Sequence, residues 1–190
     1  MKILGIDTAT DILNLAIIEN KTVVYNFKMN KAGFTHSAIL IPFIENIINF
    51  AGYKLNELDV IAVSIGPGSF TGLRIGLATA KGLSFALAIP LVGINTLEAY
   101  ALQWKDLPGI LCPIIKARKG EYYFTFYQNN KKNNELIKKE EYLCKKWINI
   151  KDRLLKLKEP VFIFGYGIDD ILEENIFIES SENRNHFIEK

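Results

Sequence analysis

A short glycine-proline segment near the middle of the chain has the residue types that bind anions through backbone groups. The apolar run 60–63 predicts a buried strand, and Gly66, Pro67 and Gly68 predict a tight turn before a helix from Thr71. The N–H groups of such a turn, at the positive end of a helix dipole, can bind phosphate or carboxylate. The alternative interpretation is that the glycines only permit backbone angles closed to other residues.

Residue types that bind metals or act as nucleophiles are sparse. The chain has two histidines, His36 and His186, and two cysteines, Cys112 and Cys144, which lie far apart without ligand spacing. We predict two buried free thiols in a reducing compartment. Neither a Ser-His-Asp nor a Cys-His arrangement is apparent, and no Lys-Ser or Lys-Thr of a P-loop follows the glycine turn. The sequence therefore predicts no metal centre and no nucleophilic active site.

Size and composition indicate a folded protein of modest charge. The chain has 190 residues, 49% of them hydrophobic, and a formal net charge of +2, which favours one domain or two small lobes. Met1 and Lys2 lead straight into a predicted strand, so we expect no signal peptide and a cytoplasmic protein. The longest apolar helix candidate contains Lys81, which argues against a membrane span.

Strands and helices alternate along the chain after an opening meander of three strands. This order predicts an α/β fold with a mixed sheet. A boundary at 106–109 divides a first lobe, 1–105, from a second, smaller lobe with a polar C-terminal tail, 106–190. The predicted strands are 2–7, 13–18, 22–27, 60–64, 90–94, 110–115, 121–127 and 160–164. The predicted helices are 35–50, 71–88 and 96–104, with a polar loop at 128–134 and a partly helical segment at 140–157.

Two of these predicted helices carry too little charge for ordinary surface helices. Helix 35–50 has Glu45 as its one ionised residue, and it is apolar most of the way round. In helix 71–88 small residues recur every four positions, so another backbone can approach closely. The helices either pack only on each other and on the sheet, or form a patch for another subunit. The residues predicted for that patch are His36, Ile39, Leu40, Phe43, Ile47, Gly72, Leu73, Gly76, Leu77, Ala80 and Ser84.

The basic residues are concentrated in the second half of the chain. Residues 116–158 carry thirteen basic and five acidic side chains. A solvated lysine-rich surface is the favoured interpretation, because regular aromatic interleaving is lacking and Glu140 and Glu141 stand among the lysines. Direct RNA binding by this stretch is the alternative, and it predicts an affinity that falls steeply with salt.

Several motifs together closely resemble the TsaB (YeaZ) family. The resemblance is strong over residues 1–100 and weak beyond them. It implies an actin-like, Hsp70-like ATPase fold of two ribonuclease-H-like lobes with mixed sheets, and the short polar end of the chain leaves open a reduced second lobe. The motifs are Ile6-Asp-Thr-Ala-Thr10, Thr35-His-Ser37, Gly66-Pro-Gly-Ser-Phe-Thr-Gly-Leu-Arg-Ile-Gly76, Ala80-Lys-Gly-Leu83 and Gly93-Ile-Asn-Thr-Leu-Glu98.

The resemblance also implies a function. It predicts a non-catalytic scaffold subunit of the complex that installs N6-threonylcarbamoyl on adenosine 37 of tRNA. The implied partners are a TsaD-like transferase, bound through the first-lobe helices, and a TsaE-like ATPase. Without the transferase, the same patch should form a homodimer. ATP and magnesium would be used by the complex rather than bound by this chain alone, tRNA would be reached indirectly, and no membrane is implied.

The resemblance also sets limits on chemistry by this chain. TsaD-like subunits hold a metal with a His-x-x-x-His pair, but here His36 is followed four residues later by Leu40. His36 is therefore expected to form a hydrogen bond at the helix start or an interface contact. Actin-like ATPases place a carboxylate where Asp7 stands, and a stand-alone ATPase or small-molecule kinase is the alternative function; an Asx turn is the structural alternative. The predicted nucleotide- or phosphate-binding residues are Asp7, Thr8, Gly66, Gly68, Ser69 and Thr71.

Overall fold

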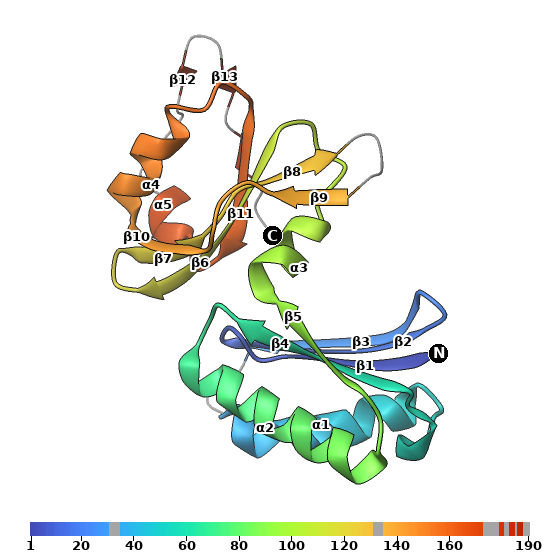
Figure 1. Ribbon diagram of the computed structural model, residues 1–190. Coiled ribbons are helices and arrows are strands. Elements are labelled where there is room, and N and C mark those ends of the chain that lie inside the picture. Colours follow the sequence, from blue (N-terminus) through green and yellow to red (C-terminus); the bar gives the residue numbers. More distant parts are fainter. Residues whose placement is uncertain (31–34, 131–134, 173–178, 181–182, 185, 188–190) are drawn as a thin grey trace. The chain divides into compact units, whose positions relative to one another are not determined.

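The chain divides into two compact units, Met1–Thr96 and Leu97–Lys190. The computed structural model (Figure 1) describes residues 1–30, 35–130, 135–172, 179–180, 183–184 and 186–187. The division differs from the predicted 1–105 and 106–190 lobes in where it puts helix α3 (Thr96–Leu102), most of which belongs to unit 2.

Unit 1 is built on a five-stranded mixed sheet in the order β3-β2-β1-β4-β5. The central strand β1 (Lys2–Asp7) pairs antiparallel with β2 (Ile12–Glu19), which pairs antiparallel with β3 (Thr22–Asn30). On its other side, β1 runs parallel to β4 (Val60–Gly66), which runs parallel to β5 (Leu91–Asn95). The sheet therefore brings the carboxyl ends of β1 and β4 together at one edge.

Two helices, α1 (His36–Phe50) and α2 (Phe70–Leu87), cover one face of this sheet and pack side by side (Figure 1). A single 3-10 turn, Leu55–Glu57, precedes β4. Alternate strand residues point toward the helices and are buried, as the period of two in a half-buried strand requires. The largest side chains in this core are Leu4, Leu13, Leu15, Ile17, Leu40, Ile47 and Ile61.

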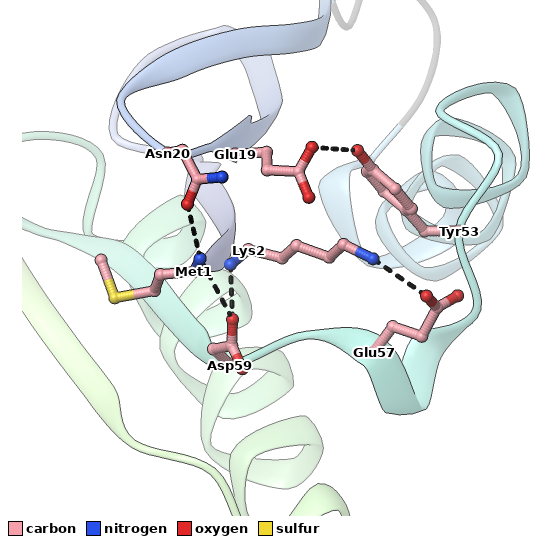
Figure 2. Close-up of polar contacts among 7 residues, drawn as sticks. All are labelled: Met1, Lys2, Glu19, Asn20, Tyr53, Glu57 and Asp59. Carbon is pink, nitrogen blue, oxygen red and sulfur yellow. Dashed lines mark hydrogen bonds and ion pairs between the residues drawn. The ribbon is translucent and has the colours of Figure 1, made fainter.

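A cluster of polar contacts surrounds the N-terminal end of β1. The Lys2 ammonium lies 2.9 Å from a Glu57 carboxylate oxygen and 4.0 Å from the centre of the Tyr53 ring. The Tyr53 hydroxyl donates a 3.0 Å hydrogen bond to Glu19. Figure 2 shows these contacts among Met1, Lys2, Glu19, Asn20, Tyr53, Glu57 and Asp59. They tie the first strand to the segment that leads into β4.

Unit 2 has a sheet in the order β10-β7-β6-β11-β14. Strand β6 (Ile110–Arg118) pairs antiparallel with β7 (Glu121–Phe124), and β7 pairs antiparallel with β10 (Leu143–Lys146). Strand β11 (Val161–Tyr166) runs parallel to both β6 and β14 (His186–Phe187). When these five strands are numbered among themselves in chain order, their order is third, second, first, fourth, fifth, which is also the order of the unit 1 sheet.

Helices and shorter strands complete unit 2. Helix α4 (Trp147–Leu154) buries Trp147, Ile150 and Leu154 in the core, at helical spacing. The described part of helix α5 (Asp169–Leu172) follows β11, as α2 follows β4 in unit 1. Strand β8 (Tyr127–Asn130) belongs to the same sheet, because it pairs with β6 as well as with β9 (Glu135–Lys138). Strands β12 (Glu179–Ser180) and β13 (Asn183–Arg184) form a separate pair.

The two sheets confirm the predicted α/β fold with mixed sheets, but local predictions in unit 2 were wrong. The single strand expected at 121–127 is two strands, because β7 pairs beside Ile114 while β8 pairs beside Ile110 and Leu111. Residues 128–130 of the predicted loop lie in β8, and 131–134 fall outside the described residues. Of the two thiols expected to be buried, Cys112 is buried and Cys144 is exposed. No helix in the described ranges is long and apolar enough to cross a membrane.

Candidate functional site

The glycines at the start of α2 are packed against the chain that links β1 to β2. A Cβ atom built on Gly68 would collide with the carbonyl of Ala9, and one on Gly72 would collide with the carbonyl of Thr8. A Cβ on Gly76 would collide with the Thr8 hydroxyl. Glycine is therefore required at these three positions for a close approach inside the unit, which is a structural use of the motif.

Hydrogen bonds within unit 1 occupy the polar groups of this turn. The Ser69 N–H donates to the Ala9 carbonyl at 2.6 Å, and the Gly72 N–H donates to the Ser69 hydroxyl at 3.2 Å. The Thr8 hydroxyl is buried and donates to the Gly72 carbonyl at 2.8 Å. A backbone cradle for an anion needs free N–H groups. The Ser69 and Gly72 N–H groups already have acceptors within unit 1.

Asp7 ends β1 beside this turn, and its carboxylate is also engaged. One oxygen accepts the Ala9 N–H at 2.9 Å, which closes an Asx turn, and the other lies 3.3 Å from the Asn14 amide nitrogen. Within the described ranges, no three His, Cys, Asp or Glu side chains gather into a metal-binding group. The Asp7 carboxylate therefore has the Asx-turn role that was its structural alternative.

The remaining two residues predicted to bind phosphate lie on opposite sides of the turn. Gly66 is buried at the end of β4, with a φ of 101° that favours glycine. Thr71 is exposed on the first turn of α2. The structure thus brings Asp7, Thr8, Gly68 and Ser69 together around Ala9, and leaves Thr71 facing solvent.

His36 joins the start of α1 to the same region. Its Nε2 lies 2.9 Å from the carbonyl oxygen of Thr10, and the ring is buried. The carbonyl accepts, so Nε2 carries the hydrogen of this bond. His36 is therefore a hydrogen-bonding residue at the helix start, one of the two roles expected for it. Leu40, one turn further on, is 1% exposed and lies in the core.

Most residues predicted to meet a partner lie inside unit 1 instead. Seven of them are buried, so a partner cannot touch them in this conformation: His36, Ile39, Leu40, Ile47, Gly72, Gly76 and Ala80. The apolar stripe of α1 and the row of small residues on α2 face the chain's own sheet and the β1–β2 connection. The partner was expected on these sides of the helices, so that orientation was wrong.

The four remaining residues of the predicted set are partly exposed. Phe43 stacks on Phe27 with ring centres 4.4 Å apart, and the Ser84 hydroxyl donates to the Ile89 carbonyl at 2.6 Å. Leu73 and Leu77 are partly buried along the side of α2. These residues border the surface without forming most of it.

The outward sides of the two helices carry large apolar side chains that were not among the residues predicted to meet a partner. On α2, Phe70 is 68% exposed and Phe85 is 90% exposed. On α1, Ile41 and Phe50 are exposed. The sequence contained a signal for the exposed side of α2, because helical spacing places one set of residues opposite the row of small residues. The residues of this set are Phe70, Arg74, Ala78, Lys81 and Phe85. We call Ile41, Phe50, Phe70, Ala78 and Phe85 the outer helix residues.

Few charged side chains lie near the outer helix residues, and these residues remain exposed to solvent. Arg74 stacks over the Phe70 ring with its guanidinium carbon 3.9 Å from the ring centre. Phe50 stacks on Tyr25, with ring centres 5.8 Å apart. The Phe85 ring makes no ring contact among the described residues. Exposed large apolar side chains on a weakly charged helical surface are typical of a protein-binding site.

Comparison with known proteins identifies the family. A family model described as "TsaD: tRNA N6-adenosine threonylcarbamoyltransferase" matches residues 29–158. The chain is 30% identical to the "tRNA threonylcarbamoyladenosine biosynthesis protein TsaB" of Bacillus subtilis, over 97% of this chain and 82% of that protein. It belongs to the TsaB (YeaZ) family. A TsaB protein of Buchnera aphidicola subsp. Schizaphis graminum is 35% identical, over 91% of this chain and 82% of its own length.

Solved structures agree with this TsaB assignment. YeaZ from Pseudomonas aeruginosa superposes with a TM-score of 0.64 at 26% identity, covering 75% of this chain and 66% of that one. The ethanolamine utilization protein EutJ from Carboxydothermus hydrogenoformans gives 0.60 at 11% identity, over 98% of this chain and 84% of that one. The EutJ match shows the fold alone. This TsaB-family chain therefore has the expected actin-like ATPase fold.

Proposed function

We propose that this TsaB-family chain is a non-catalytic subunit in the biosynthesis of N6-threonylcarbamoyladenosine in tRNA, and that it binds a TsaD-like transferase. Its TsaB relatives carry the name of this biosynthesis. The TsaD family model also matches this chain over residues 29–158, so the two kinds of subunit are related in sequence.

The observation that carries the proposal is the exposure of the outer helix residues. Phe85 keeps 90% of its surface in water, although burying such a ring is favourable by about 1.5–3 kcal/mol. Aromatic side chains that are exposed in the free protein and buried in the complex are common binding hot spots. The outer helix residues are therefore the proposed docking site for the transferase.

The non-catalytic part of the proposal is supported by the state of the glycine turn. The Thr8 hydroxyl, the Ser69 and Gly72 N–H groups and the Asp7 carboxylate all have partners within unit 1. ATP and magnesium would then act on other subunits of the complex, and this chain alone would bind no cofactor. A TsaE-like ATPase would join the two proteins, and tRNA would be modified on the assembled complex.

The docking site also predicts what the chain does without its partner. A self-complementary apolar surface can pair with a second copy about a twofold axis. We therefore expect a homodimer in the absence of the transferase, and exchange of that homodimer for a heterodimer when the transferase is added.

Mass measurement of the chain alone and mixed with its TsaD-like partner tests the proposal. We expect Phe85→Glu to weaken the complex at least tenfold, which is about 1.4 kcal/mol. Ile148→Glu is the matched control, because Ile148 is also an exposed apolar residue on a helix, but in unit 2. Equal affinity of Phe85→Glu, Phe70→Glu and the unmodified chain would contradict the docking site. Failure of the unmodified chain to bind would contradict the function.

A further inference from the structure

Four cationic residues from two separate segments lie at the same end of three neighbouring strands of unit 2. Arg118 ends β6 and Lys119 follows it in the turn to β7, and Lys145 and Lys146 end β10. All four are exposed. Strand β10 lies beside β7, with Lys146 opposite Glu121, while Arg118 is opposite Glu121 on the other side (Figure 1). We call Arg118, Lys119, Lys145 and Lys146 the basic corner.

A backbone contact joins the two segments. The Trp147 N–H, just after β10, donates to the Gly120 carbonyl in the β6–β7 turn at 3.2 Å. Adjacent strands lie about 4.8 Å apart. The register therefore places Arg118, Glu121 and Lys146 in a row across three neighbouring strands. Lys119 follows Arg118 in the turn, and Lys145, one residue before Lys146, points to the opposite face of the sheet at the same end.

The charge of this corner is not balanced by the described acids. Glu121 forms an ion pair with Arg118, and this hydrogen bond lowers the pKa of the Glu121 carboxyl, with a further contribution from Lys146. Glu140 is paired with Arg153 and Glu141 with Lys138. Within the described part of the chain, no ion pair engages Lys119, Lys145 or Lys146.

The start of α4 adds positive potential at the same place. Its N-cap is Lys146, no side chain caps the helix, and its first turn contains no acid. The N–H groups of a helix start and the helix dipole both favour a negative ligand. A corner with four cations, one carboxylate and an uncapped helix start has the electrostatics of a polyanion contact.

We propose that the basic corner contacts the phosphate backbone of tRNA directly. The proposal rests on the proposed function, since that function supplies tRNA as the substrate of the complex. It adds a direct contact by this chain, whereas the resemblance implied that the chain reaches tRNA only indirectly. Phosphate contacts from lysine and arginine position a nucleic acid without reading its sequence. Binding through the corner is therefore salt-dependent and independent of tRNA sequence.

Fluorescence anisotropy of a labelled unmodified tRNA transcript, titrated with the chain–transferase complex at several salt concentrations, tests the proposal. The variant is Lys119→Ala/Lys145→Ala/Lys146→Ala. Each lost phosphate contact lowers the slope of log affinity against log salt by about 0.9. We expect a slope about two to three units shallower and at least a tenfold weaker complex at low salt.

Lys28→Ala/Lys156→Ala/Lys158→Ala is the matched control, because it removes three exposed lysines and the same charge elsewhere. Equal losses in the two variants would show a general charge effect and overturn the proposal, as would wild-type binding by the corner variant. A corner variant that loses the transferase rather than tRNA would make the corner a protein contact, which also overturns it. Phe85→Glu tests the proposed function separately, because it leaves the corner intact.

Discussion

At the scale of single residues, Thr8 shows how one buried hydroxyl determines the residues around it. The hydroxyl donates to the Gly72 carbonyl, and the Thr8 backbone and side chain fill the space where Cβ atoms of Gly72 and Gly76 would be. The sequence predicted that these glycines allow close approach. It could not show that the approaching backbone belongs to the same chain, because residues 8 and 72 are distant in sequence.

We expect Gly72→Ala to lower the free energy of unfolding by about 2–3 kcal/mol, the upper part of the range for overpacking, because its Cβ would meet backbone that cannot move away. Gly82→Ala is the control on the same helix. Gly82 is exposed with nothing near its Cβ position, so alanine should raise stability by about 1 kcal/mol through helix propensity. Denaturant unfolding measures both, and a neutral Gly72→Ala would contradict the packing described here.

The polar cluster at the start of β1 makes stability depend on pH at both extremes (Figure 2). The hydrogen bond from Lys2 lowers the pKa of Glu57 below its ordinary 4.5, so this contribution is present above that pH and lost on acidification. Hydrogen bonds raise the pKa of Lys2 above 10.5, through Glu57, and that of Tyr53 above 10.0, through Glu19. Those contributions are present below these values and lost as pH rises further.

Lys2→Met tests this pH dependence, because it removes the charge and keeps the length of the side chain. We expect the fall in Tm between about pH 5 and pH 3 to become shallower than in the unmodified protein. Lys28→Met, at an exposed lysine on β3, should leave the slope unchanged. Identical profiles for Lys2→Met and the unmodified protein would contradict a role for the Lys2–Glu57 pair.

At the scale of elements, α1 and α2 were predicted from their apolar pattern. Three of their four ends differ from the prediction by one residue, and the end of α1 at Phe50 agrees with it. Periodicity shows that a helix has an apolar stripe, but not which surface covers it. The stripe on α1 proved to face the sheet, and the partner was expected there because α1 has so little charge. The exposed sides of α1 and α2, which point away from the sheet, are the better candidate for docking.

Substitution of two neighbouring residues on α1 allows effects on stability and effects on docking to be measured separately. Leu40 is 1% exposed and Ile41 is 62% exposed. We expect Leu40→Ala to cost about 2–5 kcal/mol of unfolding free energy, as for a buried leucine. Ile41→Ala should change unfolding by less than about 0.5 kcal/mol, yet weaken binding of the transferase. Thermal unfolding and mass measurement on both variants check this, and an Ile41→Ala protein with full affinity would exclude Ile41 from the docking site.

At the scale of the whole molecule, the repeated strand order of the two sheets had no counterpart in the sequence. The first-lobe motifs predicted unit 1 well, because strand ends, turns and helices follow each other at regular intervals there. Unit 2 was less predictable, because β7 and β8 read as one strand and their separation depends on pairing to different parts of β6. Unit 2 nevertheless contains five strands in the same order as the five strands of the unit 1 sheet.

The engaged groups at the glycine turn predict the behaviour of the isolated chain toward nucleotide. We expect calorimetric titration of ATP with magnesium onto this chain alone to show no micromolar binding, because the Asp7 carboxylate and the Ser69 and Gly72 N–H groups already have partners. Micromolar binding with turnover that Asp7→Ala abolishes would instead support a stand-alone enzyme.

The two cysteines differ in a way that is useful at the bench. Burial raises the pKa of the Cys112 thiol far above its usual value, while Cys144 is exposed on β10 beside Lys145. A maleimide dye added to the native, unmodified protein would thus attach at a single position, next to the surface proposed to meet tRNA. The chain carries its own built-in reporter, with no engineered cysteine needed.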